Sequence, residues 1–179
     1  MGWTDNWRGL KNAMLLGAFK SGLDTLVTTS GTIVSELAPN SSVRPISPMT
    51  AYSAYPDYAY QNFIRVGTGS TPPSTSDYKL DAPTNNINYL SLANEEIVYD
   101  VANGSATKTV VMTIQNSTAN SITLREWAVI NRVGYGNSYS TYTGDILLYR
   151  DLFASPVTLG AYESATLTLT LTLTLNDPL

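Results

Sequence analysis

The sequence has 179 residues, of which 43% are hydrophobic, so it is long enough for one domain with a proper core. Only 13% of the residues are charged, and the formal net charge is −4 without any basic cluster, which argues against a nucleic-acid partner. Cysteine and histidine are both absent, which excludes disulfides, thiolate metal sites and every catalytic triad that depends on histidine. We therefore expect a non-enzymatic protein without a cofactor or a metal.

The sequence predicts neither a membrane span nor a signal peptide. No stretch approaches the roughly 20 apolar residues that a membrane span requires. The N-terminus has Asp5 before any basic residue and only a short apolar run at 13–19, which is unlike a signal peptide. We expect the protein to be made in a cytoplasm and to stay soluble there.

Residues 4–21 are the one segment with helical periodicity. Thr4 or Asp5 can cap its start, its apolar residues recur at spacings of three and four, and Gly22 follows its end. This amphipathic segment either packs on its own domain or docks on a partner protein. The residues that would make the partner contact are Trp3, Trp7, Leu10 and Met14.

The next segment predicts a short hairpin followed by a linker. Two apolar pairs, 26–27 and 33–34, flank a turn-like sequence, and the prolines within 38–50 break regular structure. We therefore divide the chain into an N-terminal arm at 1–50, which would attach the protein to a partner, and a main domain at 51–179.

The main domain is a series of alternating segments with no helix between them to allow a parallel crossover. This pattern predicts an all-β fold, an antiparallel β-sandwich of the jelly-roll or immunoglobulin-like type, preceded by the short N-terminal helix and arm. We expect 107–115 and 122–131 to pair as a hairpin, and 132–145 to be an exposed loop. The strands expected are 62–66, 87–101, 107–115, 122–131, 146–149 and 165–175.

One carboxylate lies on an apolar face of this pattern. Alternation places Glu126 on the same face as Leu124, Ala128 and Ile130. A buried carboxylate needs a partner such as Arg150, so we interpret Glu126 as a structural ion-pair residue rather than a catalytic acid.

The last strand is the clearest element, because leucine and threonine alternate in it without a break from 165 to 175. We expect its leucine face to be buried against the apolar faces of 107–115 and 122–131. A strand of this length can outrun its own domain, so we expect Leu173 and Leu175 to contact another subunit.

Tyrosines gather in two other places. One group, from Tyr52 to Tyr60, lies among small residues, which is typical of a contact surface or of a domain's own edge. The other group lies in the loop at 132–145, whose composition is typical of an adaptable recognition surface. Its candidate recognition residues are Tyr135, Tyr139 and Tyr142.

Several short motifs occur in an order that resembles a known module. Together they resemble a β-sandwich module of tailed-bacteriophage virion proteins, over roughly residues 60–175. The resemblance implies a structural role in the head or tail and no catalytic residue. The motifs are Arg65–Pro72, Asp77–Leu80, Thr123–Trp127, Leu147–Asp151 and Pro156–Leu159.

The expected function is therefore that of a non-enzymatic virion structural protein, assembled in the cytoplasm of a bacterial host. It would be a homo-oligomeric decoration or fibre-like protein on the capsid, attached to other virion proteins through its arm. A tail or baseplate component is the close alternative, and a carbohydrate-binding module that recognises a surface glycan is the second. A glycosidase is disfavoured, since acids such as Glu95, Glu96, Asp100 and Asp145 occur in any acidic loop.

Overall fold

The computed structural model describes residues 4–7, 26–34, 52–53, 62–137 and 140–174. This described part is almost entirely β-structure, with a single helical turn at 5–7. Its strands are β1 (Leu26–Val27), β2 (Ile33–Val34), β3 (Tyr52–Ser53), β4 (Asn62–Gly67), β5 (Ile87–Asp100), β6 (Ser105–Asn116), β7 (Ile122–Asn137), β8 (Ser140–Leu159) and β9 (Ser164–Thr174).

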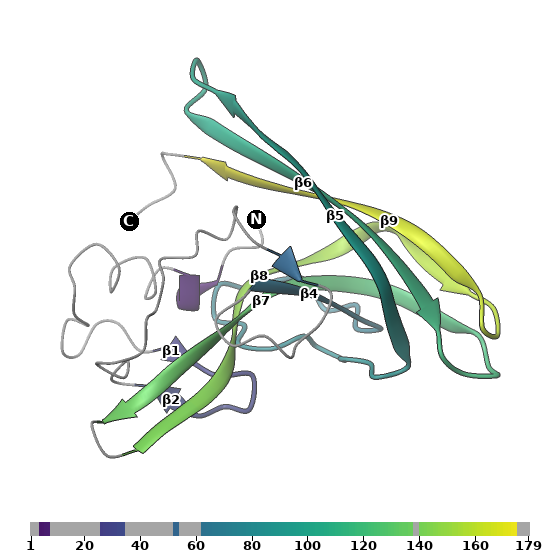
Figure 1. Cartoon of the computed structure of the whole chain (residues 1–179), viewed down its shortest axis with the longest axis horizontal. Coiled ribbons are helices and arrows are strands. Elements are labelled where there is room, and N and C mark those ends of the chain that lie inside the picture. The colour runs from purple at the N-terminus through teal and green to yellow at the C-terminus, as the bar shows by residue number, and fades with distance from the viewer. Residues whose placement is uncertain (1–3, 8–25, 35–51, 54–61, 138–139, 175–179) are drawn as a thin grey trace.

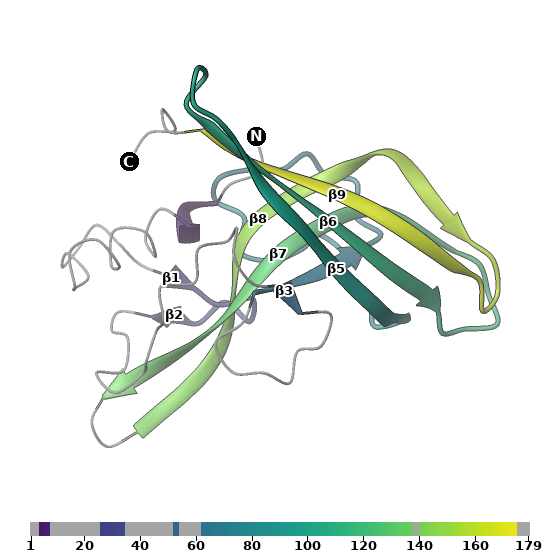
Figure 2. The same ribbon diagram turned by 45° about the horizontal axis from the view of Figure 1, so that its top comes forward.

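The strands form two sheets that pack face to face, which confirms the predicted β-sandwich. One sheet has the order β3-β4-β7-β8 and the other β5-β6-β9, while β1 and β2 form a separate hairpin. Neighbours are antiparallel except for the short β3-β4 pair, which is parallel. Figures 1 and 2 both show the three-stranded sheet crossing over the other, with the β5-β6 turn and the far ends of β7 and β8 projecting in different directions.

The last strand has the two faces that its alternation predicts. Leu167, Leu169 and Leu171 are buried in the main core, whereas the threonines between them are exposed. The position of the leucines differs from the prediction in one respect. β9 is hydrogen-bonded to β6 in the same sheet instead of lying across from it in the opposite sheet. The leucines therefore extend the inner face of β6, and this combined face packs against the other sheet.

The predicted hairpin between 107–115 and 122–131 is wrong. β6 pairs with β5 and β9, whereas β7 pairs with β4 and β8, so residues 117–121 connect the two sheets. A two-residue period predicts which side chains share a face, but it does not predict which strand is the neighbour. Both arrangements satisfy the same alternation.

The predicted loop at 132–145 is mostly strand. β7 continues to Asn137 and β8 begins at Ser140, and the backbones of Tyr135 and Tyr142 are directly paired. Tyrosine and threonine favour extended structure, which outweighs the turn-forming glycines here. β8 also continues through Pro156, which is tolerated because β8 is an edge strand.

The assignment of Glu126, Ala128 and Ile130 to the face of Leu124 is also wrong. The β7-β8 register shifts between Leu124 and Glu126, with Leu124 opposite Val157 and Glu126 opposite Leu152. Such an irregularity reverses the alternation. Leu124 thus faces the main core between the sheets, whereas Ala128 and Ile130 belong to a smaller cluster on the outer face.

The described N-terminal residues pack on the sandwich. The predicted β1-β2 hairpin is confirmed, and Leu26 and Val34 are buried in the main core. Thr28 bridges Ile146, and the Thr4 hydroxyl donates to the Leu147 carbonyl over 2.6 Å, so both cover the free edge of β8. Residues 8–21 of the predicted helix and the domain boundary at residue 50 lie outside the described residues.

Within the described ranges, no helix is long and apolar enough to cross a membrane.

Candidate functional site

The outer face of the four-stranded sheet is covered by the β4-β5 loop, residues 68–86, which is anchored on Glu126. This carboxylate is fully buried. Its Oε1 accepts hydrogen bonds from the Ala82 and Gly69 backbone N–H groups at 2.7 and 3.2 Å. Its Oε2 accepts from the Asp81 N–H at 3.0 Å and from Arg150 Nε at 2.7 Å. The predicted ion pair with Arg150 is therefore confirmed.

Arg150 extends the same network to the start of the loop. Its Nη1 donates to Asp77 Oδ2 at 2.7 Å and its Nη2 to the Thr71 carbonyl at 2.8 Å. Burial alone would lower the pKa of Arg150, but its hydrogen bonds with Glu126 and Asp77 outweigh burial and raise the pKa. The network holds a loop of nineteen residues against the sheet and leaves both oxygens of Glu126 occupied.

Two glycines allow the loop to approach this carboxylate. A Cβ on Gly67 would lie 2.5 Å from Glu126 Oε1, and one on Gly69 would lie 2.6 Å from the same atom. The Gly67-x-Gly69 sequence thus provides room for a buried carboxylate. No local pattern reveals this role, because Glu126 is 57 positions away from Gly69.

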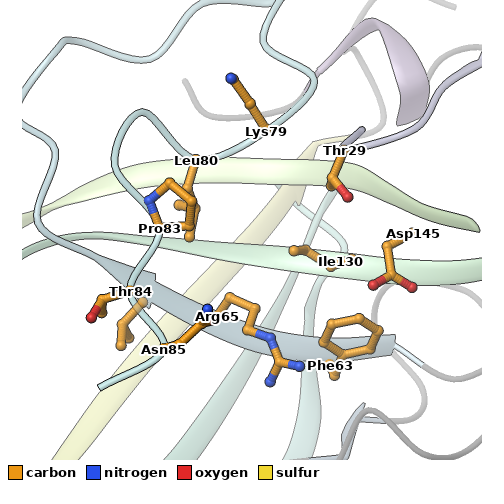
Figure 3. Close-up of a pocket in the computed structure, with 11 residues that line it drawn as sticks. Thr29, Phe63, Arg65, Lys79, Leu80, Pro83, Thr84, Asn85, Ile130 and Asp145 are labelled. Atoms are coloured by element: carbon orange, nitrogen blue, oxygen red, sulfur yellow. The ribbon is translucent and has the colours of Figure 1, made fainter. Parts of the chain in front are cut away.

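Beside the anchored loop lies a pocket of about 220 Å³, shown in Figure 3. Its walls come from β4, β7, the β4-β5 loop, the turn between β1 and β2, and the start of β8. The lining residues are Thr29, Phe63, Arg65, Val66, Lys79, Leu80, Pro83, Thr84, Asn85, Ile130 and Asp145.

Arg65 is one of two cationic residues, with Lys79, that line this pocket. Its guanidinium carbon lies 4.7 Å from the ring centroid of Phe63 and 5.2 Å from that of Tyr89, so two aromatic rings hold it. The Tyr89 hydroxyl accepts a hydrogen bond from the Val66 N–H at 3.1 Å, and burial raises the pKa of Tyr89. Among the described residues, no carboxylate pairs with Arg65.

Asp145 also lines the pocket and is already charge-compensated. Arg132 Nε contacts Asp145 Oδ1 at 2.7 Å, and Arg132 Nη2 contacts Oδ2 at 3.2 Å. The Arg132 guanidinium also lies 5.7 Å from the Phe63 ring centroid. The pocket therefore combines a neutralised carboxylate with a cation that has no counter-charge among the described residues.

The predicted attachment residues are only partly described. Trp7 is 9% exposed and belongs to the main core, which favours packing on its own domain for this turn of the helix. Trp3, Leu10 and Met14 lie outside the described residues.

The predicted recognition and oligomer residues are also only partly described. Tyr135 and Tyr142 are paired along the backbones of β7 and β8, and Tyr139 is outside the described part. Leu173 is half-buried at the margin of the main core, and Leu175 is not described.

Of the acids considered for glycosidase chemistry, Asp100 and Asp145 have described side chains, and these two belong to different sheets. Asp145 pairs with Arg132 on the outer face, whereas Asp100 accepts hydrogen bonds from Asn103 in the β5-β6 turn. No group of three side chains suited to a metal ion occurs among the residues that the structure describes.

Sequence reasoning missed the pocket, because its residues come from five separate segments. The one local signal is the alternation of Phe63 and Arg65 on the face of β4 opposite Ile64 and Val66, which are in the main core.

Comparison with known proteins gives no relative: no protein-family model, curated protein or solved structure matches the chain.

Proposed function

We propose that this protein is a non-enzymatic structural component of a tailed-bacteriophage particle. In this role the sandwich is the exposed body of a capsid decoration or fibre-like protein, and the N-terminal arm attaches it to other virion proteins. A tail or baseplate component is the alternative location. The ordered motifs between residues 65 and 159 support the phage assignment, since they resemble a virion β-sandwich module.

The observation that carries a structural role is the apolar tip of the three-stranded sheet. At the β5-β6 turn, Val98, Tyr99 and Val101 are 66%, 70% and 91% exposed. Single exposed apolar residues are normal, but several large ones on one projecting tip are typical of a protein contact. This tip supports contact with copies of the same chain or with neighbouring virion proteins.

The outer face of the same sheet supports this role as well. The threonines of β9 are exposed, and Thr166 lies beside Thr113 of β6 with 3.4 Å between their hydroxyl oxygens. Such a row of neutral hydroxyls can approach another neutral protein surface without the cost of removing charges from water. Leu173, at the end of β9, lies next to this projecting region.

Attachment can be tested with point variants of the arm. Deletion of the whole arm would also remove Leu26 and Val34 from the core, so it would not separate attachment from folding. We expect the full-length protein to cosediment with phage particles that lack it. The Leu10→Ser/Met14→Ser variant should bind these particles at least about tenfold more weakly than the wild type. Leu90→Ser is the matched control, because Leu90 is an exposed apolar residue of β5, and this variant should bind as the wild type does.

Two results would count against the proposal. If the arm variant cosediments as well as the wild type, the arm is not the anchor. If the wild-type protein binds no such particle, the virion assignment itself is wrong.

A further inference from the structure

We propose that the pocket beside the β4-β5 loop binds the ring of an acidic sugar, whose carboxylate contacts Arg65. This binding activity goes beyond the structural role proposed above and does not depend on it. Four features of the pocket support it: its size, its apolar lining, the guanidinium of Arg65 and its neutral hydrogen-bonding rim.

The size of the pocket suits one sugar ring. Its volume of about 220 Å³ is below the roughly 300–1,000 Å³ of sites that hold drug-sized ligands. Ile130, Leu80 and Pro83 line it with apolar surface, and Figure 3 shows these residues on two sides of the pocket. Apolar contact of this kind suits the C–H faces of a sugar ring.

The charge of the pocket favours an anion. Arg65 has no carboxylate partner among the described residues, and its guanidinium is held between two aromatic rings. A planar guanidinium can donate two parallel hydrogen bonds to a carboxylate, and a preoriented one loses less entropy when it does so. Lys79 adds a second cation at the rim, although Figure 3 shows its side chain directed away from the others.

The rest of the pocket favours hydroxyl groups over further negative charge. Thr29, Thr84 and Asn85 offer neutral donors and acceptors. Asp145 is compensated by Arg132, yet carboxylate oxygens can accept more than one hydrogen bond each, so it can also accept sugar hydroxyls. An inorganic anion would leave the neutral donors and acceptors of the rim unused, and a neutral sugar would leave the charge of Arg65 unused. A ring with one carboxylate and several hydroxyls satisfies both.

Calorimetric titration of the full-length protein with galacturonate tests this inference. We expect a dissociation constant in the millimolar range, on the order of 1–10 mM, as for a single small ring. Galactose, which lacks the carboxylate, should bind at least about tenfold more weakly, because it forgoes the charge-assisted hydrogen bonds. Acetate and N-acetylglutamate, which lack the hydroxyls, should also bind more weakly.

Variants locate the binding in the pocket. Arg65→Gln should weaken galacturonate binding about tenfold or more, and Arg65→Lys should give an intermediate loss, because it keeps the charge but not the planar pair of donors. Arg125→Gln is the matched control, since Arg125 is an exposed arginine on β7 that does not line the pocket. It should bind as the wild type does.

Several results would overturn the inference. These are equal affinity for galactose, equal affinity for acetate or N-acetylglutamate, unchanged binding by folded Arg65→Gln, and no binding at about 50 mM galacturonate. If Arg65→Gln does not fold, the Thr84→Val/Asn85→Ala variant tests the pocket instead. The inference then requires that this variant bind galacturonate at least about threefold more weakly than the wild type. Because the titration uses the isolated protein, its outcome is independent of the particle experiment.

Discussion

Glu126 lies beside the apolar Ala128 and Ile130 on the outer face of β7, and its two oxygens accept four hydrogen bonds. Three of these come from backbone N–H groups of the β4-β5 loop and one from Arg150. Leu80 is the loop residue that joins the outer apolar cluster. Polar contacts therefore hold the loop against the sheet, and the pocket beside the loop depends on them.

Loss of this carboxylate should therefore destabilise the whole domain. We expect Glu126→Gln to lower the free energy of unfolding by about 3–5 kcal/mol, because it leaves the buried Arg150 without its fully buried counter-charge. Gln also places an NH₂ group where only acceptors fit. Urea denaturation followed by circular dichroism measures the difference.

The ion pair between Arg132 and Asp145 provides the control for that experiment. Both side chains are 26% exposed, so water compensates part of any loss. We expect Asp145→Asn to cost only about 1 kcal/mol or less. Equal losses for Glu126→Gln and Asp145→Asn would show that burial of the Glu126 network adds nothing to its stabilising effect.

At the scale of the element, alternation predicted strands well and their neighbours poorly. Residues 165–175 form β9 almost as expected, since every leucine from Leu167 to Leu171 is buried on one face. The face assignment failed in β7, where an irregularity at Arg125 reverses the alternation. The pairing of β6 with β9 follows from long-range packing of the two sheets, which no local pattern encodes.

The candidate site was predictable only in part. The Glu126–Arg150 pair could be inferred, because a carboxylate among apolar residues needs a compensating charge. The pocket could not, because part of its wall, Leu80 and Pro83, comes from the loop that Glu126 binds through the Ala82 N–H. Loop placement of this kind depends on hydrogen bonds to backbone groups, which leave no trace in side-chain periodicity.

Adjacent residues of β9 offer a direct test of its two faces. Leu171 is fully buried and Thr170 is exposed. We expect Leu171→Asp to abolish cooperative folding, since it places an unpaired charge in the core. Thr170→Asp should change the free energy of unfolding by no more than about 0.5–1 kcal/mol. Thermal unfolding followed by circular dichroism compares them, and a cooperative transition in Leu171→Asp would contradict a buried leucine face.

At the scale of the whole molecule, the two sheets overlap in the middle and diverge toward their projecting ends (Figure 2). The main core is located where they overlap, and Ala106 and Leu173 lie at its margin. Beyond that margin the three-stranded sheet ends in the exposed Tyr99 and Val101. Apolar residues that continue past the core of their own sheet can be covered by a second copy of the chain. We therefore expect the protein to self-associate.

Self-association through the tip can be measured directly. We expect the wild-type protein to form oligomers at about 100 μM, and Tyr99→Ser/Val101→Asp to shift them to monomers, because the change removes apolar contact area and adds charge to a chain of net charge −4. Both positions are more than two-thirds exposed, so the melting temperature should stay within a few degrees of the wild type. Analytical ultracentrifugation measures the mass, with Leu90→Ser as the control for an exposed apolar residue away from the tip. A monomeric wild type, or a double variant that still forms oligomers, would place the contact elsewhere on the molecule.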